Sequence, residues 1–289
     1  MSVALVVLLV ALLAAGGALA LSLARGTGLD PVDPAVEERV VAEVIQRHRR
    51  VRRFLVERLD RESAGGLLLT LGFAITFVTA LLIGVTFDMV DRQRGLARWD
   101  ASVARWGADH AGSTSTEVMR SVTHLGGTVV AVSVFALVAL YVHVRQGNRE
   151  VWLFVAAVAL GQLLMSNLIK LVVDRDRPQL FQVVEAAGSS FPSGHSTAAA
   201  ATWAAVALLL GRGRSRTLRA ALAAGAVLVA VGVATSRAML GVHWLTDVVA
   251  GLALGWGWFL LVAVVFGGRA QRLGDVATAD PEGVPDRAA

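Results

Sequence analysis

A single lysine, Lys170, lies near the end of a long apolar segment in a chain that otherwise uses arginine for its positive side chains. It begins the polar cluster KLVVDRDRP (170–178), in which Arg177 follows seven residues later. Seven residues are two helical turns, so the spacing predicts both cations on one helix face, about 10 Å apart, with the helix ending at Arg177 because Pro178 disfavours helical backbone before it. A lysine inside a membrane helix costs a few kcal/mol, so it either binds an anion or extends its charged end to the interface.

A second cluster, SSFPSGHS (189–196), directly precedes another apolar segment. Gly194 lets backbone N–H groups approach an anion closely, and the N-terminus of the following helix adds a positive dipole end. Ser193 can donate a hydrogen bond, and His195 can carry a proton near neutral pH. Taken alone, the stretch is also typical of an ordinary turn and helix cap.

The third cluster is SRAMLGVHWLTD (236–247). Arg237 closes one apolar segment, Gly241 interrupts the helix, and His243 and Asp247 stand four residues apart at the start of the next. That spacing places the two side chains on one helical face. A carboxylate can keep one imidazole nitrogen protonated and leave the other free as a nucleophile or base, although an interfacial ion pair would use the same pair of residues. The other four histidines have no such neighbours and are assigned to loop or interface positions.

Together the clusters supply the groups that a phosphate site needs. Phosphoryl transfer depends mainly on electrostatic stabilisation of phosphate oxygens, and three cations, a helix start, two histidines and one carboxylate offer it. The sequence shows no carboxylate cluster with metal-ligand spacing, so we expect no bound Mg²⁺ or Zn²⁺ and no other cofactor. The candidate residues are Lys170, Arg177, Ser193, Gly194, His195, Arg237, His243 and Asp247.

The elements that position these clusters are predicted to be membrane helices. Hydrophobic residues make up 55% of the 289 residues and charged residues 17%, whereas soluble domains carry about 25% charged residues. Apolar segments of about 20 residues match the length of a helix that crosses a bilayer, and a lone span must satisfy its backbone internally. We therefore predict an all-α polytopic membrane protein with seven spans, near residues 2–24, 65–87, 124–144, 151–173, 196–211, 220–240 and 244–267.

Composition divides the chain into four parts. Residues 1–24 are predicted as an N-terminal transmembrane anchor, with a cleaved signal peptide as the alternative. Residues 25–63 are predicted to form a basic amphipathic segment on the cytoplasmic membrane surface, with a solvated linker helix as the alternative. Residues 64–267 make up the predicted six-span core, and residues 268–289 a polar tail.

Arginine placement predicts the orientation. Alternate loops and the tail carry 18 of the arginines, and the other loops carry eight. By the positive-inside rule the first set is cytoplasmic, so all three polar clusters emerge together on the extracytoplasmic side of a multi-pass cell-membrane protein. The net charge of +5 is spread over loops and forms no single patch, which argues against a nucleic-acid partner. There is no cysteine, and hence no disulfide or thiolate site.

The clusters resemble the signature of the type 2 phosphatidic acid phosphatase (PAP2) superfamily, the membrane lipid phosphate phosphatases. That signature is K-x6-RP, then PSGH, then SR-x5-H-x3-D. The chain matches every position, with Lys170, Arg177-Pro178, Pro192 to His195, Ser236-Arg237, His243 and Asp247. The motifs cover 170–247 and the six-span core about 65–267, so the N-terminal anchor and basic segment lie outside the resemblance.

The resemblance implies metal-independent hydrolysis of a lipid phosphate. It implies that His243 attacks phosphorus to form a phosphohistidine, that Asp247 orients this imidazole, and that His195 protonates the leaving oxygen and then activates water. The phosphate oxygens would be held by Lys170, Arg177, Arg237, Ser193 and the Gly194 amide.

Several alternatives remain at this level. The substrate is expected to be a polyprenyl pyrophosphate, which we favour, phosphatidic acid or phosphatidylglycerol phosphate. A phosphotransferase would use the same site with an alcohol in place of water. A non-enzymatic transporter or lipid-phosphate binder is disfavoured, because transporters tend to place ionisable residues at the bilayer midplane. The partners expected are the lipid substrate and membrane lipids, and the sequence does not define an oligomeric state.

Overall fold

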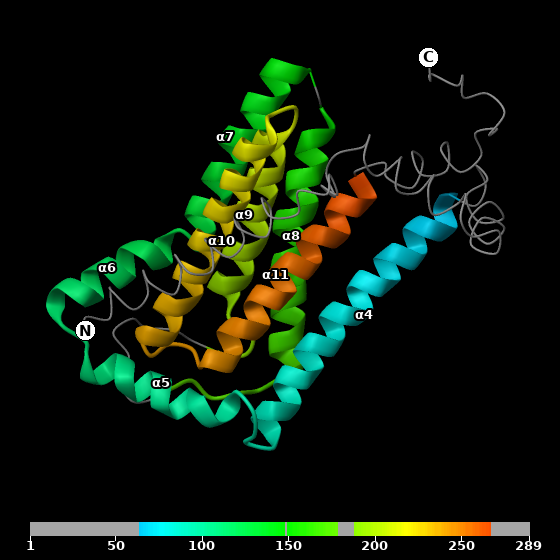
Figure 1. Ribbon diagram of the computed structural model, residues 1–289. Coiled ribbons are helices and arrows are strands. Elements are labelled where there is room, and N and C mark those ends of the chain that lie inside the picture. The colour runs from blue at the N-terminus through cyan, green and yellow to red at the C-terminus, as the bar shows by residue number, and fades with distance from the viewer. Residues whose placement is uncertain (1–63, 148, 179–187, 267–289) are drawn as a thin grey trace, which may run out of the picture. The chain divides into compact units, whose positions relative to one another are not determined.

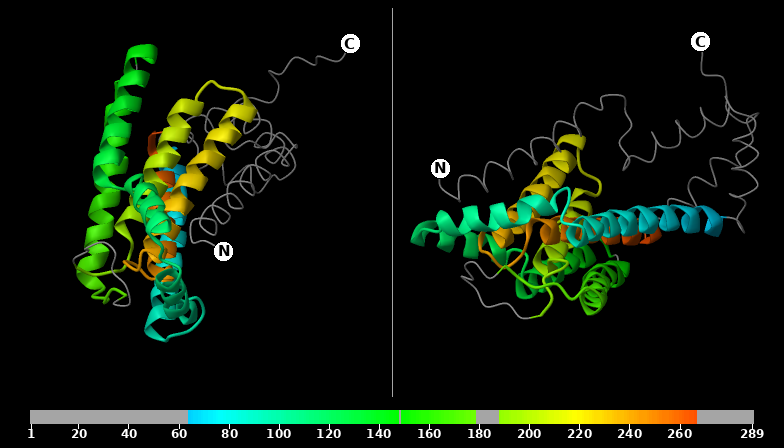
Figure 2. Two further views of the ribbon diagram at one scale, coloured as in Figure 1. Left: turned by 90° about the vertical axis from the view of Figure 1, so that its left-hand side faces the viewer. Right: turned by 90° about the horizontal axis from the view of Figure 1, so that it is seen from below.

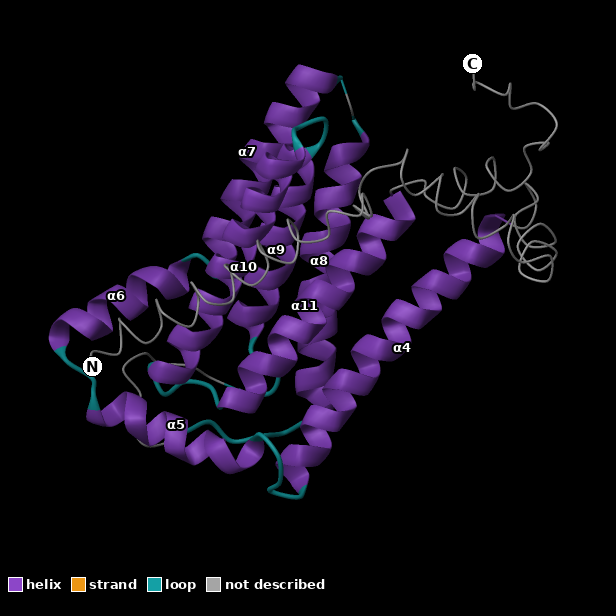
Figure 3. Cartoon of the chain, in the orientation of Figure 1, coloured by secondary structure: helices purple, strands orange, loops and turns teal. Residues whose placement is uncertain are grey.

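The computed structural model describes residues 64–147, 149–178 and 188–266, and every regular element in these ranges is a helix (Figure 3). Residues Thr76–Val262 belong to one compact unit, which holds all of the candidate site. In chain order the helices are α4 (Ala64–Asp91), α5 (Ala97–Asp109), α6 (Ser113–His124), α7 (Thr128–Gln146), α8 (Glu150–Val172), α9 (Gly194–Gly211), α10 (Arg216–Met239) and α11 (Leu245–Phe266). The all-α prediction is therefore confirmed for this part of the chain.

Five of the described helices are long and apolar enough to cross a membrane. They are Gly72–Asp91, Thr128–Arg145, Glu150–Val172, Arg216–Met239 and Leu245–Phe266. The remaining predicted core span, 196–211, forms helix α9 but is not among the five. The predicted anchor at 2–24, the basic segment at 25–63 and the tail at 268–289 lie outside the described residues.

Helix α9 is enclosed by other helices of the bundle. It packs against α7, α8 and α10 (Figure 1), and its first turn holds His195, Ser196 and Thr197. Most of its residues are buried, and the commonest of them is alanine. Helices that are surrounded by other helices in a membrane use small residues to approach closely and have little lipid to contact, so α9 does not need a strongly hydrophobic surface.

Helix α11 packs directly on the start of α9. A Cβ atom added at Gly251 would lie 2.6 Å from the backbone oxygen of Ser193, and one added at Gly255 would lie 2.4 Å from that of Thr197. Glycine at these two positions permits the close approach of the two backbones. The beginnings of α9 and α11, which carry two of the three polar clusters, are thus held next to each other.

Two amphipathic helices, α5 and α6, cross the bundle at the end where α10 finishes (Figures 1 and 2). Their residues lie between the predicted spans at 65–87 and 124–144, where the sequence predicted a loop. The face of α5 that is buried consists of Ala97, Asp100, Ala104 and Gly107. A Cβ atom at Gly107 would lie 2.7 Å from the carbonyl oxygen of Met239, so α5 lies directly against the end of α10.

The polar clusters meet because of the alternating helix directions. Helix α8 ends at Val172, α9 begins at Gly194, α10 ends at Met239 and α11 begins at Leu245. These four helix ends lie at the same end of the bundle, at the bottom of Figure 1. The fold therefore gathers segments that are far apart in the sequence into one place.

Candidate active site

The segment after α8 carries Arg177, but not in the helical position that the sequence predicted. Helix α8 ends at Val172, and Val173 is already extended, so Lys170 and Arg177 do not share a helix face. The chain instead pairs with the segment before α9, since the N–H of Ser190 donates to the carbonyl of Arg175 at 2.8 Å and the Ser190 hydroxyl to that of Asp176 at 3.1 Å. This non-local pairing, which sequence periodicity does not reveal, replaces the last part of the predicted helix, residues 173–177.

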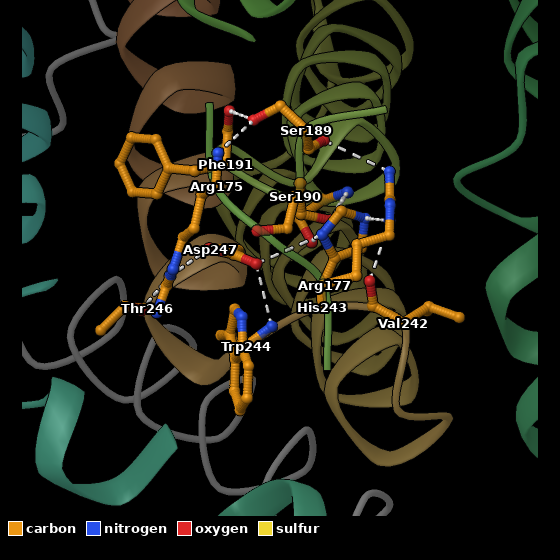
Figure 4. Close-up of polar contacts among 12 residues, drawn as sticks. Arg175, Arg177, Ser189, Ser190, Phe191, Val242, His243, Trp244, Thr246 and Asp247 are labelled. Atoms are coloured by element: carbon orange, nitrogen blue, oxygen red, sulfur yellow. Dashed lines mark hydrogen bonds and ion pairs between the residues drawn. The ribbon is translucent and has the colours of Figure 1, made fainter. Parts of the chain in front are cut away.

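Lys170 and Arg177 still converge, on the carbonyl of Ser189. The ammonium of Lys170 donates to this oxygen at 2.9 Å, and Nη2 of Arg177 does so at 3.3 Å. Arg177 also donates to the carbonyls of Gly188 (Nε, 3.0 Å) and Val242 (Nη1, 2.8 Å). The guanidinium therefore joins the first and third clusters, as Figure 4 shows.

The start of α9 places the second cluster between the other two. The N–H of Ser193 donates to the carbonyl of Asp247 at 3.0 Å, and its side chain accepts from the hydroxyl of Ser196 at 2.9 Å. Ser193 is the N-cap of α9, and the helix begins at Gly194. A Cβ atom at Gly194 would meet only the Ser166 hydroxyl, at 3.9 Å, so packing alone does not demand a glycine there.

His195, in the first turn of α9, is half-buried among positively charged and titratable groups. The positive charges of Arg237 and Lys170 act on its ring. The turn that follows α6 packs on its backbone, because a Cβ atom at Gly126 would lie 2.7 Å from the His195 carbonyl oxygen. The turn after α6 thus lies directly against the backbone of His195.

Arg237, in the last turn of α10, is 5% exposed and belongs to the same cluster. Its Nη1 donates to the hydroxyl of Thr123 in α6 at 3.3 Å. Its Nε is buried and has no hydrogen-bond partner within the described part of the chain. Buried N–H groups nearly always have a partner, so this donor is suited to an anionic ligand.

His243 is almost completely buried and lies between Arg177 and Asp247. Its Nε2 is 3.3 Å from Nη1 of Arg177, and its Nδ1 is 3.5 Å from Oδ2 of Asp247. A guanidinium can only donate, so Nε2 is the nitrogen with the lone pair and Nδ1 carries the proton. The longer Nδ1–Oδ2 distance makes no hydrogen bond here, and such contacts often tighten only when substrate binds.

Burial keeps the His243 ring neutral. Desolvation is the largest influence and lowers the pKa of His243 to about 4, with Asp247 opposing this shift and Arg237 and Arg177 reinforcing it. A neutral imidazole has an unshared electron pair on Nε2 at neutral pH. The predicted spacing of four residues thus brings ring and carboxylate together, although His243 itself precedes the first residue of α11.

Asp247 has a further partner that the sequence did not predict, Arg175, which in turn pairs with Asp100. Nη1 of Arg175 pairs with its Oδ1, and Nη2 of Arg175 lies 2.7 Å from Oδ2 of Asp100 in α5. Asp100 also accepts from the N–H and hydroxyl of Thr246, at 2.9 and 2.7 Å. The available signal was the spacing of Ala97, Asp100, Ala104 and Gly107, which places one acid on an otherwise small and apolar helix face.

The arrangement can bind a tetrahedral anion and attack it. Lys170, Arg177 and Arg237 provide positive charge, the start of α9 provides backbone N–H groups, and His243 provides a lone pair. Within the described residues, acidic and histidine side chains form no cluster of three that would hold a metal ion.

Comparison with known proteins places this site in a family. The model of the PAP2 superfamily matches residues 150–270. Lipid A 1-phosphatase of Rhizobium etli is 38% identical over 145 residues, which cover 46% of this chain and 56% of that protein. The chain thus spans little more than half of the length of this relative.

Two further relatives are covered more completely. Phosphatidylglycerophosphatase B of Bacillus subtilis is 32% identical over 152 residues, 50% of this chain and 72% of that protein. Decaprenylphosphoryl-5-phosphoribose phosphatase of Mycobacterium tuberculosis is 33% identical over 154 residues, 52% of this chain and 80% of that protein.

A solved structure shares the fold. The crystal structure of a transmembrane PAP2-type phosphatidylglycerolphosphate phosphatase from Bacillus subtilis superposes with a TM-score of 0.60 at 24% identity, over 68% of this chain and 96% of that one. The shared fold is that of a multi-pass membrane protein. The two relatives above, each more than 30% identical and covered over more than two thirds of its length, show that the chain belongs to the PAP2 superfamily.

Proposed function

We propose that the protein is a membrane lipid phosphate phosphatase that hydrolyses a phosphomonoester or pyrophosphate through a phosphohistidine intermediate. The observation that carries the proposal is the convergence of Lys170, Arg177 and Arg237 around the neutral ring of His243. The unpartnered Nε of Arg237 adds a donor that a phosphate oxygen would satisfy.

The reaction has two steps. In the first, the lone pair on Nε2 of His243 forms a bond to phosphorus while the bond from phosphorus to the lipid oxygen breaks, and His195 gives that oxygen a proton. In the second, His195 takes a proton from water, whose oxygen attacks phosphorus and releases His243 and inorganic phosphate. Asp247 holds Nδ1–H and balances the positive charge that the ring gains in the first step.

Binding of the phosphate oxygens is assigned to the surrounding donors. These are Lys170, Arg177, Arg237, the Ser193 hydroxyl and the Gly194 N–H. To reach the phosphate, Arg177 exchanges its contact with Nε2 of His243 for a phosphate oxygen. The exchange also frees the lone pair that attacks.

Location supports a lipid substrate. The site lies at helix ends, where a headgroup would be near the interface and the tail would remain in hydrocarbon. The arginine-rich loop 212–215 joins α9 to α10 at their opposite ends. By the positive-inside rule that loop is cytoplasmic, so the site faces the extracytoplasmic leaflet. The finer topology proposed is a six-span core in which α9 is the fully surrounded span.

The substrate is proposed by class. Relatives are named for lipid A, phosphatidylglycerol phosphate and decaprenylphosphoryl-5-phosphoribose phosphate, which share a phosphate on a large hydrophobic anchor. Polyprenyl pyrophosphate and phosphatidic acid have the same chemistry and complete the candidate set.

The test is phosphate release from this set by the purified full-length protein in EDTA. We expect release from at least one lipid, with loss of about three orders of magnitude or more in His243→Ala. His110→Ala is the matched control, since His110 lies exposed at the end of α5 and stacks on Trp106. Undiminished release by His243→Ala would overturn the assigned nucleophile, and loss of activity in EDTA would overturn metal independence.

The same assay separates the alternatives. An added acceptor alcohol that captures the phosphoryl group in preference to water would indicate a phosphotransferase. Binding of lipid phosphate without any phosphate release would indicate a non-enzymatic binder or transporter.

A further inference from the structure

The carboxylate of Asp247 is fully buried and is occupied on both oxygens. Oδ1 accepts from Arg175, and Oδ2 accepts the N–H of Trp244 at 2.9 Å. The ring of His243 shares Oδ2 only at 3.5 Å. Asp247 is therefore not a partner of His243 alone, and its orientation is set from the opposite side by Arg175.

Arg175 is itself held on every side. Its guanidinium pairs with Asp100 at 2.7 Å, donates to the hydroxyl of Thr246 at 2.8 Å, and lies 5.5 Å from the ring centre of Trp244. Its side chain is only 14% exposed. Figure 4 shows the guanidinium directed at Thr246 and Asp247. A planar, multidentate guanidinium so enclosed fixes the geometry of its acceptors.

The groups form a row that runs from the neutral ring of His243 through Asp247 and Arg175 to Asp100. Buried carboxylates are costly unless each is paired and hydrogen-bonded, and here one guanidinium serves two of them. The positive charge of Arg175 offsets part of the attraction that Asp247 exerts on a proton at His243. Asp100 in turn offsets part of the charge of Arg175, so the two residues act on His243 in opposite directions.

We propose that Arg175 and Asp100 are positioning residues for the nucleophile, which fix the Asp247 carboxylate and set how strongly it holds a proton on His243. The inference rests on the proposed function, because it assigns a purpose to the balance around His243. Neither residue belongs to the signature that the sequence analysis used. The two link the active site to α5, which lies across the end of α10.

Other charged groups around His243 act in the same place. Arg177 follows α8, Arg237 lies in α10 and His195 in α9, and each interacts electrostatically with the ring or its neighbours. Lys170 of α8 interacts with Asp247. All four remain in the variants below, so differences between variants report the Arg175–Asp100 pair.

The test compares Arg175→Gln with Asp100→Asn in the full-length protein. Nitrogen-15 NMR of labelled histidines measures the pKa of His243, and phosphate release measures the pH dependence of kcat/KM. Arg175→Gln leaves Asp247 unbalanced, so the pKa of His243 and the acid limb of the profile should rise by about one unit. Asp100→Asn removes the carboxylate that offsets the charge of Arg175, so the pKa of His243 and the acid limb of the kcat/KM profile should both move to lower pH. Each variant should also lose about 10-fold or more in kcat.

The matched control is Arg94→Gln, which removes an arginine from an exposed pair with Asp88 and should leave the pKa of His243 unchanged. Equal losses of kcat with an unchanged pKa of His243, or a shift of this pKa in the same direction in both variants, would overturn the inference. If Arg175→Gln does not fold, the downward shift in Asp100→Asn decides. If the wild type releases no phosphate, the proposed function fails, whereas the NMR titrations still test the charge balance.

Discussion

The backbone N–H of Ser193 donates a 3.0 Å hydrogen bond to the carbonyl oxygen of Asp247. This bond ties the first residue before α9 to the first turn of α11, although 54 residues separate the two positions in the sequence. The start of α9, proposed to bind phosphate, and the carboxylate next to the proposed nucleophile His243 are thus joined by one direct contact. Changes that separate α9 from α11 should therefore alter catalysis as well as stability.

Gly251→Ala should test that contact. The new Cβ atom would lie 2.6 Å from the carbonyl oxygen of Ser193, so α11 must move away from α9. Overpacking of this kind costs about 1–3 kcal/mol, and we expect a lower thermal midpoint in detergent together with a clear loss of kcat. Gly225→Ala in α10 is the control, since nothing lies within 4 Å of its added Cβ. Equal behaviour of the two variants would contradict the prediction.

Lys170→Arg should lose most of the activity while the protein still inserts into the membrane. The ammonium donates to the Ser189 carbonyl at 2.9 Å as a compact charge, and a wide planar guanidinium cannot reproduce this position. A charge-assisted hydrogen bond is worth about 1.5–3 kcal/mol, which corresponds to a loss of about 10- to 100-fold in kcat/KM. Membrane yield measures insertion, and phosphate release measures activity. Normal turnover by the variant would contradict phosphate binding by Lys170 and would favour a charged end that merely extends to the membrane interface.

Thr123→Val should weaken substrate binding through Arg237. The hydroxyl of Thr123 accepts from Nη1 of Arg237 at 3.3 Å, and valine has the same shape without the acceptor. A guanidinium that is no longer held in place should raise KM by about 10-fold, which corresponds to the lower end of the free energy of a hydrogen bond to a charged group. Thr235→Val is the control, because its hydroxyl donates only within α10, to the carbonyl of Val231. An unchanged KM in the Thr123 variant would refute the link.

The acid sensitivity of the protein should follow His243. Because burial lowers the pKa of His243 to about 4, the ring stays neutral from neutral pH down to about pH 5. The unfolded chain takes up this proton near pH 6.5, so the contribution of the neutral ring to stability is complete above that pH and is lost as the pH falls towards 4. Titration of the labelled ring, assigned by its disappearance in His243→Ala, measures the value directly. A midpoint near 6.5 would show that burial does not dominate.

Much of the site could be predicted from residue types and order alone. The three clusters were assigned to one end of the bundle because apolar segments alternate in direction, and their residues do meet there. Arg177 was misplaced because its segment pairs with Ser189 and Ser190 instead of extending α8. Hydrogen bonds between distant segments leave no periodic signal.

The supporting residues were harder to find for the same reason. Asp100, Thr123 and Arg175 act across 146, 114 and 72 residues of sequence, respectively. Helices α5 and α6 lack the long apolar run that identifies a span, and only their amphipathic spacing distinguishes them from a loop. The groups proposed to contact the phosphate can therefore be predicted from the sequence more readily than the groups that hold them in place.

The alanine-rich, enclosed character of α9 has a consequence for how the protein is made. A helix that its neighbours enclose has little contact with lipid in the folded protein, so α9 should enter the bilayer together with α10, the next helix to be synthesised and one against which it packs. The turn of Ser193, Gly194 and His195 would then reach its final depth late in assembly, after α7 and α8 have formed the wall against which α9 packs.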